Sequence, residues 1–170
     1  MASLMDDLKD VLQQENRQYQ ELIALSEEKC QVLVRGDVNR LEQITALEQQ
    51  QTDVLHQYEM KRKSILKDMA EVLGKDPKTF TVEAMIRALA SQPEEQNRLI
   101  ELRDQLRITL HKMAEINTQN QALIKQALEM VEFDLTLFRS LRQAPETANY
   151  NKSAYNTGDL LGSGGFDAKQ

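Results

Sequence analysis

The stretch from residue 94 to residue 143 contains neither glycine nor proline. A run of this length, rich in Leu, Glu, Gln and Arg, predicts one continuous α-helix, because these side chains lose little rotamer freedom in a helix. Such a helix would be roughly 75 Å long at 1.5 Å per residue. The whole chain has only six Gly and three Pro, which disfavours the many turns of a sheet. We therefore expect an all-α fold.

Two other long helices and one short helix are predicted before this one. Ser3 is the expected cap of the first helix, and Gly36 suits the left-handed conformation that ends it. Asp37 can cap a second helix that extends from Val38 to about Leu73. A short amphipathic helix is expected at residues 82–90. The prediction is an antiparallel helical bundle or coiled coil of three long helices plus one short helix.

The chain of 170 residues divides by composition into a helical domain, residues 1–144, and a flexible C-terminal tail, residues 145–170, rich in Asn, Ser and Gly. The N-terminus lacks the basic and apolar regions of a signal peptide, and no apolar run is long enough for an integral membrane segment. Cys30 is the only cysteine, so no internal disulfide can form. A cytoplasmic location is expected.

The charge and the scattered polar residues exclude several functions. A net charge of −6 without a basic stripe disfavours nucleic acid as a partner, because phosphate neutralisation supplies most of that affinity. Asp53 and His56 share one helical face, but a carboxylate-bridged metal site needs further ligands of the same kind. No catalytic residue, metal site or cofactor is predicted, and we do not expect an enzyme.

The last helix carries apolar residues on two sides near its end. The first stripe comprises Leu99, Leu102, Leu106, Leu110 and Met113 and continues as Ile124, Ala127, Val131, Leu135 and Phe138. The second row, about 100° away around the helix, comprises Leu123, Met130, Phe133, Leu137 and Leu141. A helix packed on one surface needs an apolar stripe of only about 100° or somewhat more. The end of this helix should therefore contact a second neighbour: the short helix, a second copy of the chain, or a helix of another protein.

Asn117 and Asn120 interrupt the first stripe, where apolar residues would be expected. Polar residues in a helical seam commonly fix the register of the helices at some cost in stability. We interpret both asparagines as register-setting, with partners expected on the polar middle of the second helix.

Two motifs resemble the FlgN-type flagellar export chaperones. The run KCQVLVRGDVNRLEQITALEQ resembles the family's first helical hairpin, with matches at Lys29, Leu33, Gly36, Asp37, Leu41 and Glu48. The run INTQNQALIKQAL contains the N-x-x-N-x-x-L-I pattern of its long last helix, at Asn117, Asn120, Leu123 and Ile124. The resemblance covers roughly residues 5–143, with weaker agreement at Tyr150 and Gly158.

The resemblance implies a cytoplasmic chaperone that binds hook-associated flagellar proteins, its clients. It would mask their C-terminal segments and help to deliver them to the flagellar type III export gate. The expected client-binding residues, on the family's C-terminal helical region, are Leu123, Ile124, Leu128, Met130, Phe133, Leu137, Phe138 and Leu141. Tyr150 and Tyr155 are candidates for docking to the export machinery. The alternative is a structural coiled-coil protein that self-associates through the same face, and a homodimer is also an option for the client-free chaperone.

Overall fold

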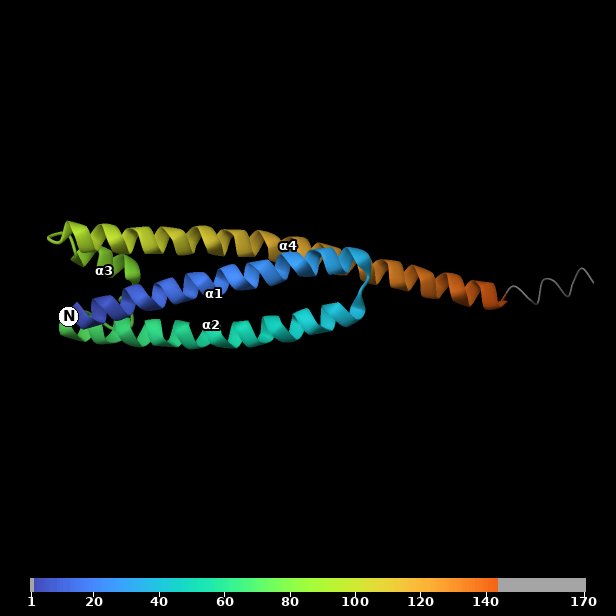
Figure 1. Ribbon diagram of the computed structural model, residues 1–170. Helices are drawn as coiled ribbons and strands as arrows, with labels where there is room; N and C mark the ends of the chain where they lie inside the picture. The colour runs from blue at the N-terminus through green and yellow to red at the C-terminus, as the bar shows by residue number, and fades with distance from the viewer. Residues whose placement is uncertain (1, 144–170) are drawn as a thin grey trace, which may run out of the picture. The chain divides into compact units, whose positions relative to one another are not determined.

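The computed structural model describes residues 2–143, and within this range all regular secondary structure is helical. The helices are α1 (Ala2–Arg35), α2 (Val38–Val72), α3 (Val82–Ala88) and α4 (Pro93–Gln143) (Figure 1). This confirms the predicted class, three long helices and one short helix. Helix α1 already begins at Ala2, so Ser3 lies inside the helix and does not cap it.

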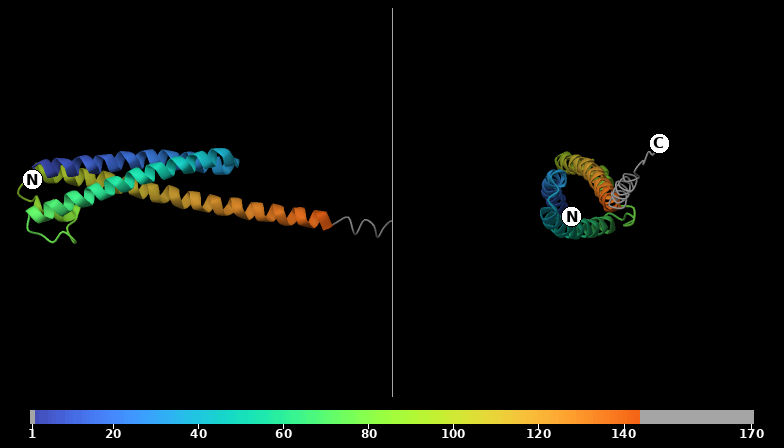
Figure 2. Two further views of the ribbon diagram at one scale, coloured as in Figure 1. Left: turned by 90° about the horizontal axis from the view of Figure 1, so that it is seen from below. Right: turned by 90° about the vertical axis from the view of Figure 1, so that its right-hand side faces the viewer.

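The chain forms two compact units that divide between Ile124 and Lys125. The first unit, which we call the bundle, contains α1, α2, α3 and residues 93–124 of α4. Within it α1 and α2 lie side by side and antiparallel (Figures 1 and 2). The described part of the second unit is residues 125–143 of α4, which we call the terminal segment. The predicted boundary between residues 144 and 145, and the tail beyond it, lie outside the described residues.

The turn between α1 and α2 has the predicted chemistry. Gly36 has a φ of +69°, in the left-handed region that favours glycine. Asp37 is the N-cap of α2, where its Oδ1 accepts a hydrogen bond from the Arg40 amide at 3.0 Å. Two residues are therefore enough to reverse the chain.

The bundle core contains leucine, isoleucine, methionine and valine side chains from all four helices. Its larger cluster comprises Met5, Leu8, Val11, Leu12, Ile65, Leu66, Met69, Met85, Ile86, Leu89, Leu99, Leu102 and Leu106. A smaller one comprises Leu22, Ile23, Leu55, Met113 and Ile116. The buried side chains of α3, Met85 and Ile86, belong to the larger cluster. Helix α3 therefore contributes its buried apolar side chains to the bundle core.

A carboxylate is buried between α1 and α2. Glu15 is only 3% exposed, and the Nη1 atom of Arg62 lies 3.1 Å from its Oε2. This contact is an ion pair only, since Oε2 accepts no hydrogen bond within the described residues. Burial raises the pKa of Glu15 above its ordinary value of 4.5, Arg62 partly offsets this rise, and Glu59 adds to it.

This raised pKa predicts an unusual dependence of stability on pH. A carboxyl whose pKa is higher in the folded state contributes stability that is fully present below its unfolded pKa and is lost as pH rises through the folded pKa. We expect Glu15→Gln to remove this loss, so that the variant gains on the wild type in free energy of unfolding as pH rises above about 4.5. Urea unfolding between pH 4 and pH 8 measures it, and parallel profiles of the two proteins would contradict it.

Candidate functional site

The second row is an exposed apolar surface. Met130, Phe133, Leu137 and Leu141 expose between 47% and 69% of their surface, and Leu123 is half-buried. The other predicted client-binding residues, Ile124, Leu128 and Phe138, are exposed as well. A contiguous apolar patch of this kind is typical of an interaction site, because scattered single apolar residues are the norm on a soluble surface.

The first stripe is also exposed where it continues into the terminal segment. Val131 and Leu135 expose 54% and 52% of their surface, whereas its earlier members Leu99, Leu102 and Leu106 are buried in the bundle. Within the described residues, the terminal segment therefore presents apolar side chains on two sides.

The polar residues of the terminal segment are acidic near its middle. It has the carboxylates Glu129, Glu132 and Asp134, and its cations Lys125, Arg139 and Arg142 lie toward its two ends, so its polar face is not rich in Lys and Arg. An anionic lipid surface attracts helices whose polar face is rich in Lys and Arg, so this segment is poorly suited to one. Of the helices described, none has a stretch long and apolar enough to cross a bilayer.

The two asparagines lie in different environments. Asn120 is buried, and its Nδ2 donates a hydrogen bond to the backbone carbonyl of Ser26 on α1 at 2.9 Å, while its Oδ1 has no partner in the described structure. Asn117 is exposed, so the structure does not place it in the buried seam. A straight helix drifts by about 20° per heptad relative to a 3.5-residue repeat. From Leu99 to Asn117, about two and a half heptads, this drift amounts to about 50°. At this level of the helix Ile116 is the residue that lies in the core.

The predicted partners on α2 contact Asn120 only indirectly. Glu48 accepts hydrogen bonds from the Ser26 hydroxyl at 3.2 Å and from the Lys29 ammonium at 2.7 Å. Lys29 and Glu48 are both positions of the first family motif, and their side chains are less than one-fifth exposed. Two residues of the motif, Lys29 and Glu48, therefore form an ion pair between α1 and α2. This pair lies next to the turn of α1 that contains Ser26, the partner of Asn120.

The unpartnered Oδ1 atom gives a stability prediction for position 120. We expect Asn120→Leu to raise the free energy of unfolding by about 1 kcal/mol, because it removes a buried carbonyl that has no hydrogen-bond partner. Asn117→Leu is the matched control and should change it by less than about 0.5 kcal/mol. Urea titrations of both variants measure this. A clear loss of stability in Asn120→Leu would show that the hydrogen bond to Ser26 outweighs the orphaned oxygen.

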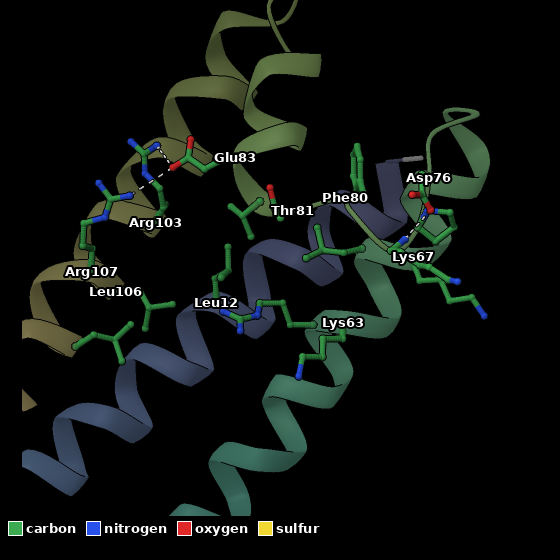
Figure 3. A pocket seen from close by; sticks show the side chains of 16 residues that line it. Leu12, Lys63, Lys67, Asp76, Phe80, Thr81, Glu83, Arg103, Leu106 and Arg107 are labelled. Carbon is green, nitrogen blue, oxygen red and sulfur yellow. Dashed lines mark hydrogen bonds and ion pairs between the residues drawn. The ribbon is translucent and has the colours of Figure 1, made fainter. Parts of the chain in front are cut away.

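A cavity of about 930 Å³ lies between α2, α4, α1 and the segment that leads into α3 (Figure 3). We call it the groove. Its apolar lining residues include Leu12, Leu66, Phe80, Val82, Leu106 and Leu110, and its charged ones are Arg62, Lys63, Lys67, Lys78, Arg103, Arg107, Asp76 and Glu83. The groove was not predicted from the sequence. The sequence signal for the groove is weak, because its basic residues come from three segments that are far apart in the chain.

The comparisons with known proteins agree with the two sequence motifs. The family model described as FlgN protein matches residues 1–158, which is most of the chain. Neither the comparison with curated proteins nor that with solved structures gives a match. The matched range includes the α1–α2 turn, the Lys29–Glu48 ion pair, Asn120 and the exposed second row. The chain belongs to the FlgN family, whose members are flagellar export chaperones and not enzymes.

Proposed function

We propose that this protein is a cytoplasmic chaperone that binds the C-terminal helical segments of hook-associated flagellar proteins. Bound there, it would prevent their premature assembly and aid their delivery to the type III export gate. The observation that carries the proposal is the exposed second row at the end of a helix whose earlier apolar residues Leu99, Leu102 and Leu106 are buried in the bundle core. An amphipathic client helix laid along this row would bury both apolar faces together.

The size of the surface fits a partner that also contacts residues beside the row. Fully burying five large apolar side chains contributes about 8–15 kcal/mol. Since four of the five expose between 47% and 69% of their surface, roughly half to two thirds of that gain is available. Association itself costs an estimated 4–15 kcal/mol. The margins of the row, Leu128 and Phe138, are therefore part of the proposed client site.

Titration calorimetry with C-terminal segments of hook-associated proteins from the same genome tests the proposal. We expect saturable binding with a negative heat-capacity change, the mark of apolar burial. Light scattering should then give the mass of one chaperone with one client. If no heat is released and the second row proves to be buried in a homodimer throughout, the structural coiled-coil function is favoured instead.

Docking to the export gate is proposed for Tyr150 and Tyr155, which lie outside the described residues. Deleting residues 145–170 should lower client secretion without lowering client affinity. Unchanged secretion would remove these residues from the proposal.

A further inference from the structure

One carboxylate lies among the exposed apolar side chains of the terminal segment. On the surface of an α-helix, the neighbours of a residue are those three and four positions away. All four such neighbours of Asp134 are large apolar residues, each at least 47% exposed: Met130, Val131, Leu137 and Phe138. Asp134 itself is exposed. Its carboxylate therefore lies where the apolar face of a client helix would contact α4.

Asp134 is at the centre of the proposed client site and not at its edge. Along the helix the site extends from Leu123 to Leu141, and position 134 is near its middle. Around the helix, at about 100° per residue, Leu137 of the second row lies about 60° to one side of Asp134 and Phe138 about 40° to the other. A client helix that covers both sides removes the carboxylate from water.

The cations of the terminal segment are not placed to neutralise Asp134. Arg139 lies five positions later, about 140° away around the helix, and Arg142 lies about 12 Å further along its axis. Among residues 2–143 the structure shows no ion pair or side-chain hydrogen bond of Asp134. A charge that is taken out of water without an opposite charge is strongly unfavourable. An occupant that covers this carboxylate must therefore bring a cation of its own.

We propose that Asp134 determines client specificity by selecting a helix that has one Lys or Arg within its apolar face. This inference rests on the proposed function and adds the chemistry by which a client is recognised. The cation opposite Asp134 would form an ion pair shielded by the apolar side chains around it. Such a pair discriminates between partners, because a helix with only apolar residues at this position would leave the carboxylate buried and unpaired.

The same carboxylate disfavours the pairing of two copies of this chain through the client site. In a two-fold contact centred on this surface, a residue at the centre faces its own copy. Two Asp134 carboxylates would then meet without a cation, and like charges placed together weaken association. Asp134 therefore favours a basic helix of another protein over a second copy of the chain.

A double-mutant cycle between the full-length chain and a client tests the inference. The probes are C-terminal helical segments of hook-associated proteins from the same genome, titrated by calorimetry. Asp134→Asn should weaken binding about tenfold or more, and so should replacement of the basic residue in the client's apolar face by Met. Both changes together should weaken binding no more than either one alone, because neither charge is then left unpaired.

The matched control is Glu132→Gln, which removes a carboxylate about 160° away around the same helix and should leave client affinity nearly unchanged. The stability of Asp134→Asn in urea should equal that of the wild type, because the side chain is exposed.

Three results would overturn the inference while the chaperone function stands: undiminished client binding by Asp134→Asn, an equal loss in the control, or tight binding of segments that have no Lys or Arg in their apolar face. A marked loss of stability in Asp134→Asn would also overturn it, since the residue would then act in folding. A wild type that binds none of the segments would overturn the proposed function, and this inference with it.

Discussion

Phe133→Ser combined with Leu137→Ser should abolish client binding while the free protein keeps its stability. Both side chains belong to the exposed second row, and neither contributes to the bundle core. Large side chains at the centre of an interface commonly contribute 2 kcal/mol or more each, so we expect affinity to fall at least about 100-fold. Calorimetry with a client segment measures the loss, and circular dichroism during urea unfolding measures stability.

Ile108→Ser is the matched control for this experiment. Ile108 lies on the same helix and is 71% exposed, but it belongs to neither apolar row of the terminal segment. It should leave client affinity unchanged. If the double variant instead unfolds at much lower urea concentration than the control, the second row is part of a core, and the client site must be sought elsewhere.

Leu99→Ala should cause the largest loss of stability among leucine-to-alanine substitutions in α4. Leu99 is fully buried in the larger core cluster, which also contains Leu8 of α1, Met69 of α2 and Met85 of α3. Truncating such a side chain removes its transfer free energy and leaves a cavity, and typically costs 2–5 kcal/mol. We therefore expect the free energy of unfolding to fall by about 2–5 kcal/mol, as measured by urea titration.

The comparison variant is Leu135→Ala, which removes the same group from the same helix at a position that is 52% exposed. It should change stability by less than about 0.5 kcal/mol when the protein is dilute, as is usual for surface positions. Equal losses for the two leucines would mean that the terminal segment has a core of its own in solution.

The helices could be predicted from the sequence because their signals are local. Gly36 and Asp37 mark the first turn, and the absence of glycine and proline from residue 94 to residue 143 predicts the length of α4. The second row was equally accessible, since helical periodicity depends only on positions within one helix. That α3 packs into the bundle core could not be predicted, because an amphipathic helix of seven residues could pack on either apolar surface.

The position of the groove and the exposure of Asn117 depend on how the helices pack against one another. Arg62, Lys78 and Arg107 line the groove but are far apart in the chain, so no local sequence pattern predicts the groove. A straight-helix wheel places Asn117 in the seam. A wheel accumulates phase error with every heptad, and over the distance from Leu99 that error is enough to exchange an exposed position for a buried one.

The two-residue turn at Gly36 also has a consequence for the order of folding. Helices α1 and α2 meet through a minimal loop, whereas the bond from Asn120 to Ser26 joins residues 94 positions apart. Closing the short loop costs far less chain entropy, so we expect the transition state for folding to contain the α1–α2 hairpin before α4 has docked. Substitutions of hairpin core residues such as Ile23 and Leu55 should then slow folding, while substitutions at Met113 or Ile116 should mainly speed unfolding.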